Sequence, residues 1–416
     1  MSQFAKEYDI KGDKKNSEFF HDYLQKIYDR REKSGLEELV GAMKGIVVQV
    51  QTGDLLNYLG ELYLMTPYRF KAGYLTPTHK IVILTNQPET PAMFIIEPLT
   101  RDFRDEFTDI NGLFPRAKEK VQARYLGEIY YTRNLGETVN ILQSQEIRFQ
   151  NPAEVRNSFL ANKNFRISDI SYFTNNIVGY TQSDFSDFAS LELGEPFDLS
   201  PEEHAKLKTV DELQKKYELD KLLLGIDHLA TRVLCGERED ALLELITMTN
   251  YYFWGAYSID EMNSSTNICR NPDIENEMHS PAKVFTANNT PFYTKTIDNL
   301  PSPTEDFVRN FGKRMHHVAY SVIDGARPDG VKNIDYVVGK LDSEDIPFLA
   351  EVIGECRDFP DLKQIFSKSS HYSILITEYV QRCHGFEGFF TKDNVAFLTQ
   401  AAGEDEALKT AAVGDA

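Results

Sequence analysis

Two stretches of this chain read alike: Gly225-Ile-Asp-His228-Leu-Ala-Thr-Arg-Val233 and Arg314-Met-His-His317-Val-Ala-Tyr-Ser-Val322. Each is a run of β-forming residues in which a histidine is followed by an aliphatic residue and Ala, and which closes on Val. A third such run, Tyr372-Ser-Ile-Leu-Ile-Thr-Glu378-Tyr-Val380, places one carboxylate among aliphatic residues. Two histidines and one carboxylate on three strands are the ligand set of a facial metal site, which holds Fe(II) and leaves the opposite positions open. The sequence therefore predicts that His228, His317 and Glu378 bind one metal ion.

Strand alternation decides between the two adjacent histidines of the second run. Successive side chains of a strand point to opposite faces, so His317 and His316 should take different faces. Matching His-Leu-Ala at 228 to His-Val-Ala at 317 selects His317. The structural alternatives stay open at this point: a strand histidine is often an ordinary core residue, and a strand glutamate often points to water from an edge.

The order of predicted elements indicates a duplicated layout. The first half shows strand-like runs, two helical stretches and further strands, and the second half repeats this order, which describes a chain of βαβββ modules. Strands are expected at 46–50, 80–84, 92–96, 126–132, from 226, within 253–298, from 315 and at 372–382, and helices at 113–123, 136–146, 237–249 and 346–356. In the first half neither of the two strands that open the layout, 46–50 and 126–132, contains a histidine. The first half is therefore expected to bind no metal.

Composition changes along the chain suggest the domain boundaries. At 416 residues two domains are the default. We expect an α+β protein with a helical lead-in at 1–40, a metal-free domain at 41–180, a linker with a helix at 181–222, a metal-binding domain at 223–400, and a tail without stable structure at 401–416.

Charge and composition narrow the classes of partner. With 45 Lys and Arg against 64 Asp and Glu, the formal charge is −19, which disfavours nucleic acid and anionic membranes because both require a basic surface. The apolar runs are too short to span a bilayer, and the polar N-terminal segment shows no signal peptide. The four cysteines are scattered without a C-x-x-C pair, so reduced thiols and a cytoplasmic location are expected.

Several motifs of the second half occur in the order known from one family. They are Ser280-Pro-Ala-Lys-Val-Phe-Thr-Ala-Asn-Asn289, Leu362-Lys-Gln364-Ile-Phe366-Ser-Lys368, Thr377-Glu378-Tyr-Val-Gln-Arg382 and Gly385-Phe386-Glu-Gly388. In this order they resemble the vicinal oxygen chelate superfamily and, within it, 4-hydroxyphenylpyruvate dioxygenase and its relatives. The resemblance covers roughly residues 40–400. It implies two domains of paired βαβββ modules, each an open barrel, with ligands from the first strands of two modules and the last strand of one.

The resemblance also implies an activity. It is the oxidative decarboxylation and hydroxylation of a 2-oxo acid by Fe(II), one ion per chain, and O₂, with 4-hydroxyphenylpyruvate as the first candidate substrate and homogentisate as its product, a step of tyrosine catabolism. Gln364, Phe366, Ser280 and Asn394 would contribute to the substrate site, and a C-terminal helix from Asp393 to about Ala401 would close it. A homodimer or homotetramer is expected.

Some positions depart from the family pattern, and they keep other functions open. His316 stands where the family usually has Gln, and Val395 follows Asn394 where the family has Phe. Phe389 or Phe390 would then supply a substrate-stacking ring. The same ligand set also serves extradiol ring cleavage, for which His316 or His279 would be the acid/base residue. A binding protein with a vestigial site is the non-enzymatic alternative.

Overall fold

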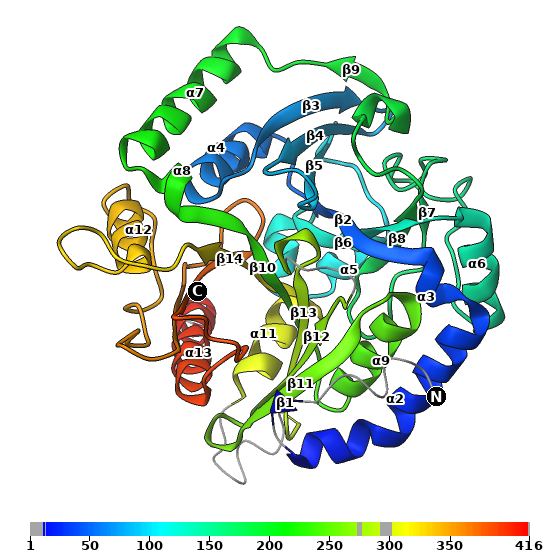
Figure 1. Ribbon diagram of the computed structural model, residues 1–416. Coiled ribbons are helices and arrows are strands. Elements are labelled where there is room, and N and C mark those ends of the chain that lie inside the picture. Colours follow the sequence, from blue (N-terminus) through cyan, green and yellow to red (C-terminus); the bar gives the residue numbers. More distant parts are fainter. Residues whose placement is uncertain (1–10, 13, 273–276, 292–301, 415–416) are drawn as a thin grey trace.

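Two curved β-sheets, one built mainly by each half of the chain, form the frame of the protein (Figure 1). The computed structural model describes residues 11–12, 14–272, 277–291 and 302–414. The first half contains, in chain order, β1 (Lys11–Gly12), α2 (Lys14–Ser34), α3 (Leu36–Leu39), β2 (Val40–Gln49), α4 (Leu55–Met65), β3 (Arg69–Leu75), β4 (His79–Thr85), β5 (Ala92–Pro98), α5 (Glu106–Gly112), η1 (Ala117–Lys120), β6 (Arg124–Thr132), α6 (Leu135–Ser144), β7 (Arg166–Ile167), β8 (Ile177–Thr181), η2 (Phe188–Leu191) and β9 (Glu195–Phe197).

A helical connection leads into the second half. It consists of α7 (Pro201–Lys216), which begins with a capping box of Ser200 and Glu203, and α8 (Leu219–Leu222). The second half contains β10 (Leu223–Arg232), α9 (Arg238–Met248), β11 (Tyr252–Ile259), η3 (Asp260–Met262), β12 (Ser264–Arg270), η4 (Glu277–His279), β13 (Ala282–Asn288), α11 (Pro303–Phe311), β14 (Arg314–Val322), α12 (Asn333–Asp342), β15 (Asp361–Phe366), β16 (Ile376–Cys383) and α13 (Lys392–Gly414).

The two sheets repeat one another strand for strand. The first has the order β7-β8-β6-β2-β5-β4-β3 and ends on β9; the second, read in the same direction, has β15-β16-β14-β10-β13-β12-β11 and ends on β1. Corresponding pairs also agree in direction. β2 runs antiparallel to β6 and parallel to β5, and β10 likewise runs antiparallel to β14 and parallel to β13. This confirms the duplicated α+β layout predicted from the sequence.

The repeat extends to two β-bulges. Where β2 pairs with β6, Lys44 is an extra residue on the first strand and Leu126 on the second. Where β10 pairs with β14, the extra residues are Asp227 and His316. A bulge turns the side chains beside it and breaks strict alternation. The shared bulges allow the halves to be matched residue by residue.

The apolar side chains form one core between the sheets and a separate cluster inside each sheet. The core between the sheets includes Val48 of β2, Leu229 of β10 and Val318 of β14. Inside the first sheet, large rings such as Phe94 and Phe165 fill the space, and each fully buried ring contributes about 1.5–3 kcal/mol. Inside the second sheet the corresponding strands contribute small residues, namely Ala230, Ala282 and Ala319. Ala230 and Ala319 stand where the first sheet has Val47 and Ile129, and they leave more room on the inner face of the second sheet.

Three of the predicted elements were wrong. The stretch 346–356 is not a helix, because Phe348 forms a bridge to Ser367 and Ile353 forms one to Gln364 of β15; the helix of this module is α12. Helix α4 was not predicted, and the stretch 113–123 holds only the short η1. The tail expected to lack structure from 401 is helical to Gly414, since α13 packs Leu398 and Ala402 on Phe366 and Ile376. Parts of the predicted segments lie outside the described residues, namely 1–10, 13, 273–276, 292–298 and 415–416.

Two of the four cysteines form a disulfide, which corrects the prediction of four reduced thiols. Cys356 precedes β15 and Cys383 ends β16, and their Cα atoms are 5.5 Å apart. They meet because β15 and β16 pair antiparallel, with Asp361 opposite Cys383. Cys235 and Cys269 keep free thiols.

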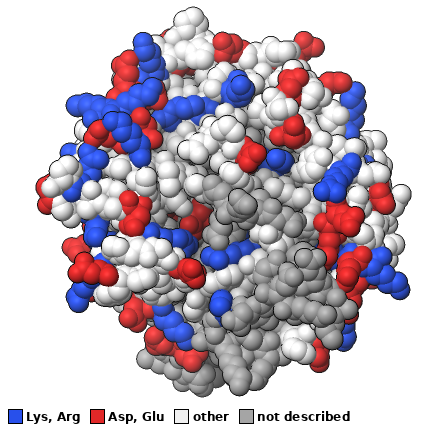
Figure 2. Space-filling view, in the orientation of Figure 1, with Lys and Arg blue, Asp and Glu red and all other residues white. Residues whose placement is uncertain are grey.

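The surface carries both signs of charge. On the face shown in Figure 2, Lys and Arg side chains stand among Asp and Glu side chains, and neither sign covers that face alone. Among the described residues we find no helix that combines the length and the apolar character needed to cross a membrane.

Candidate metal centre

Three side chains from three strands meet inside the second sheet. His228 comes from β10, His317 from β14 and Glu378 from β16, and these strands are neighbours in the sheet. The Nε2 atoms of the two histidines are 3.3 Å apart, and they lie 3.0 Å and 3.2 Å from Oε2 of Glu378. His228 and Glu378 are buried, and His317 is 12% exposed. The structure thus brings together the three residues singled out in the sequence, and within the described residues they are the one such group.

The spacing of these atoms suits one cation better than it suits hydrogen bonds. Oε2 of Glu378 is buried and forms no hydrogen bond, although both imidazole nitrogens lie close to it. Ligand atoms about 2.1 Å from a metal ion stand about 3.0 Å apart at right angles and about 3.4 Å apart at tetrahedral corners. The three observed separations fall within this range, so the residues fit a divalent metal.

A second carboxylate holds His228. Asp227 Oδ1 lies 2.8 Å from Nδ1 of His228, so Nδ1 donates to Asp227 and Nε2 is the nitrogen that faces the cluster. Arg382 donates to both oxygens of Asp227 at 2.8 Å and 3.1 Å, and Ser321 donates to one of them. Metal-binding histidines typically donate their second N–H to such a carboxylate. The bulge at Asp227 makes this contact between chain neighbours possible.

The charges around the cluster set the two histidines apart. Burial opposes the charged imidazole of His228, but Glu378 and Asp227 outweigh it and raise the pKa of His228 to about 9. Burial, and then the charge of His228, lower the pKa of His317 well below its ordinary value. Arg382 overcomes the effect of burial on Asp227 and lowers the pKa of that carboxyl. Without a metal, one proton on His228 balances Glu378, and a divalent cation would take its place.

The predicted substrate residues lie near the cluster with one exception. Gln364 Nε2 donates to Glu378 Oε1 at 2.8 Å, and Asn394 Nδ2 donates to Gln364 Oε1 at 3.3 Å, so this pair orients the carboxylate. The ring of Phe366 lies 4.8 Å from that of His317. Ser280 is the exception: its hydroxyl bonds Tyr251 and accepts from the backbone of the first half, outside the cavity at the cluster.

Both neighbouring histidines of β14 face the cluster, which strand alternation did not predict. His316 is the bulge residue, lines the cavity, and places its Nδ1 2.9 Å from Nδ1 of His317. The expectation that His316 takes the opposite face is therefore wrong. His279, the other acid/base candidate, instead lies 3.3 Å from Glu89 and does not line this cavity.

A small cavity of about 50 Å³ adjoins the cluster. Sheet residues form its walls, and Val395, Leu398 and Thr399 of α13 close it. The rings of Phe389 and Phe390 lie 5.3 Å from that of His228. Pockets for small molecules usually measure about 300 Å³ or more, so this cavity would have to widen to hold such a ligand, and α13 lines one side of it.

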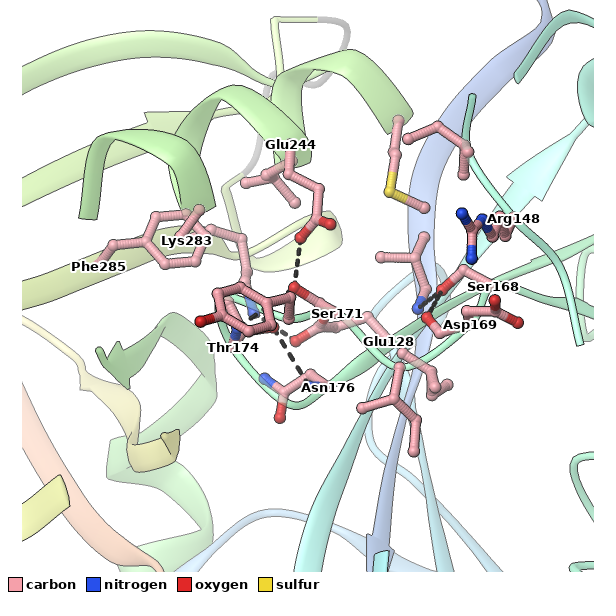
Figure 3. A pocket seen from close by; sticks show the side chains of 18 of the residues that line it. Glu128, Arg148, Ser168, Asp169, Ser171, Thr174, Asn176, Glu244, Lys283 and Phe285 are labelled. Atoms are coloured by element: carbon pink, nitrogen blue, oxygen red, sulfur yellow. Dashed lines mark hydrogen bonds and ion pairs between the residues drawn. The ribbon is translucent and has the colours of Figure 1, made fainter. Parts of the chain in front are cut away.

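A larger cavity, about 330 Å³, lies elsewhere, between the two halves (Figure 3). Glu244 of α9 accepts a hydrogen bond from Ser171, and Lys283 of β13 forms a buried ion pair with Glu128 of β6. No group of three metal-ligating side chains lines it within the described residues. The smaller cavity therefore carries the candidate metal chemistry.

Solved structures with a similar fold are found. One is a triple mutant of 4-hydroxymandelate synthase from Streptomyces coelicolor, with a TM-score of 0.57, 14% identity, and coverage of 88% of this chain and 99% of that chain. Another is a xylose isomerase-like TIM barrel/4-hydroxyphenylpyruvate dioxygenase fusion protein, with a TM-score of 0.54, 11% identity, and coverage of 91% and 57%. The chain has the vicinal oxygen chelate fold. No family model and no curated protein matches its sequence.

In the first half of the chain, glycines occupy the positions equivalent to the three clustered residues. Matching the strand registers pairs Gly45 with His228, Gly127 with His317 and Gly179 with Glu378. Phenylalanines fill the space: a Cβ on Gly45 would lie 2.6 Å from the ring of Phe94. The place equivalent to the cluster is therefore filled by apolar side chains of the first sheet.

Sequence reasoning missed the role of Asp227. Its signal was an acid directly before His228, but strand alternation places such neighbours on opposite faces. Only the register of β10 against β14 shows the bulge that joins them.

Proposed function

We propose that this protein is a non-haem Fe(II) dioxygenase that converts a 2-oxo acid and O₂ into CO₂ and a hydroxylated acid. The observation that supports it most is the buried set of three donor atoms, 3.0–3.3 Å apart, with an oriented shell behind it. His228, His317 and Glu378 would hold the metal on one face, and the opposite face would open to the cavity. Bound Fe(II) would supply the electron transfer that couples O₂ reduction to oxidative decarboxylation.

The remaining residues would set the protonation and the geometry of the ligands. Asp227 keeps the proton of His228 on Nδ1, and Gln364 holds Glu378 by one oxygen so that the other faces the histidines. Phe366 and Phe390 give the cavity apolar walls. Helix α13 would exclude water once the substrate has entered.

We propose an aromatic 2-oxo acid as substrate, with 4-hydroxyphenylpyruvate and its product homogentisate as the first pair to test. Phe366 and Phe390, which line the cavity, support this choice, because aromatic rings favour stacked or edge-on contacts. The metal-free first half would serve as a structural and dimerising half.

The test uses protein purified without oxygen and reconstituted with Fe(II). Metal content is measured first, and O₂ uptake and CO₂ release are then followed with a panel of arylpyruvates, alkyl 2-oxo acids and catechols. One iron per chain with CO₂ release from a 2-oxo acid is the expected result. Iron binding without turnover of any 2-oxo acid would overturn the proposed activity.

Extradiol ring cleavage is the second candidate, and one observation favours it. His316 lines the cavity directly beside His317, where an acid/base residue for such a reaction would stand. Uptake of O₂ with a catechol, without release of CO₂, would select this activity, and His316→Gln should then abolish it.

A further inference from the structure

Two fully buried arginines face each other across the duplicated halves. Arg124 opens β6, Arg314 opens β14, and the strand registers make them equivalent positions. Both side chains have an exposure of 0%. Their contacts are reciprocal: Arg124 donates to the carbonyl of Lys313 at 2.7 Å, and Arg314 donates to the carbonyl of Ala123 at 3.1 Å. Each guanidinium thus reaches the residue directly before the other arginine.

The hydrogen bonds of these two groups are incomplete. Nε of Arg124, and both Nε and Nη1 of Arg314, are buried without an acceptor among the described residues. The other nitrogens that bond do so with neutral oxygens, namely backbone carbonyls and the side chain of Asn111. A buried N–H without a partner destabilises the folded state, and more so when the group is charged.

The charges are not balanced either. Neither guanidinium forms an ion pair with a carboxylate in the described part of the chain. The nearest acidic influence on Arg124 is Asp105, whose carboxyl caps α5 and whose Oδ2 is itself without a hydrogen bond. Burial lowers the pKa of Arg314 to about 10, and burial with the charge of Arg314 lowers the pKa of Arg124. The two guanidiniums and the carboxylate of Asp105 together carry a net charge of one positive unit.

We propose that Arg124 and Arg314 together bind one compact monovalent anion, of the chloride class, between the two halves of the protein. Such an ion would accept the unsatisfied N–H groups of both guanidiniums and cancel the remaining charge. A water molecule would satisfy the N–H groups but leave the charge uncompensated. The site is separate from the metal centre and does not depend on the proposed oxygenase activity. Its role would be to stabilise the contact between the sheets.

The test measures thermal unfolding of the full-length protein at constant ionic strength, with sodium chloride replaced stepwise by sodium gluconate, whose anion is too large for the site. The expected result is a Tm that rises with chloride and saturates, by about 2 °C or more. Arg314→Met should remove the chloride dependence. The matched control is Arg69→Met, which removes a guanidinium that is already paired with Asp211 and should keep the dependence.

Crystals grown in sodium bromide provide a second measurement that does not require a stable variant. An anomalous peak between the two guanidinium groups is expected. A Tm that is the same in chloride and gluconate, or density for water alone at this position, would overturn the proposal. Metal content and O₂ uptake stay outside this test, so a failed oxygenase assay has no bearing on it.

Discussion

Asp227 accepts a hydrogen bond from Nδ1 of its chain neighbour His228, with 2.8 Å between the two atoms. Neighbouring residues of a regular strand point to opposite faces, so the contact depends on the bulge at this point of β10. It joins the cluster to Arg382 and so to the far end of β16, the strand that carries Glu378. The orientation of one candidate ligand is thereby tied to the strand of another.

Asp227→Asn should weaken metal binding by about 10–100-fold, because the amide does not hold the protonated Nδ1 as a carboxylate does. Affinity is measured by anaerobic titration with Fe(II) or Co(II). Ser321→Ala is the matched control, since it removes a contact to Asp227 at 3.1 Å and leaves the carboxylate in place. Equal affinity in Asp227→Asn and the wild type would mean that His228 does not bind the metal through Nε2.

His317→Ala should lose the metal, whereas His316→Ala should keep it with reduced affinity. Of these two neighbours, His317 directs Nε2 at Glu378, whereas His316 contacts the cluster through the ring of His317. Metal content of the two variants after identical reconstitution decides the point. Loss of the metal from both to the same extent would show that the two histidines act as ligands together.

Leu398→Ala should widen the substrate range, because Leu398 closes the cavity from α13. Its cost in the free energy of unfolding is expected at about 2–5 kcal/mol, as for other buried leucines. Leu341→Ala in α12 is the control with similar burial away from the cavity. Bulkier 2-oxo acids should gain in kcat/KM with Leu398→Ala only; a gain in both variants would point to general loosening of the fold.

Gly45→Ala should destabilise the first half by about 1–3 kcal/mol, because its Cβ would meet the ring of Phe94 at 2.6 Å. The metal content should remain one ion per chain. Gly60→Ala in α4 is the control: its Cβ would meet no atom within 4 Å, and alanine favours the helix by up to about 1 kcal/mol. Chemical denaturation of both variants measures the difference, and an unchanged midpoint for Gly45→Ala would contradict the aromatic filling of this site.

Glu61→Gln should stabilise the protein at pH 8 and leave it unchanged near pH 4. Burial raises the pKa of Glu61 to about 7, so the folded protein holds this proton more tightly than the unfolded chain does. The unfolded pKa is near 4.5, so the wild type loses stability as the pH rises from about 4.5 to 7. The expected difference at pH 8 is about 1–3 kcal/mol in the free energy of unfolding. Equal stabilities at pH 8 would show that Glu61 ionises without cost.

The sequence by itself was enough to find His228, His317 and Glu378 and the duplicated order of strands. Both follow from local patterns, because β-forming runs and the period of two are visible in a single segment. The missing histidines predicted that the first half lacks this ligand set, and the register places Gly45, Gly127 and Gly179 at the equivalent positions.

Only the tertiary structure decided the surroundings of the cluster. The bulges that turn Asp227 and His316 depend on how β10 pairs with β14, and strand register is a relation between segments far apart in the chain. The disulfide of Cys356 and Cys383 arises in the same way, from the pairing of β15 with β16. Local periodicity thus predicts which residues belong to the site, and the pairing of strands that are distant in the chain determines the direction of their side chains.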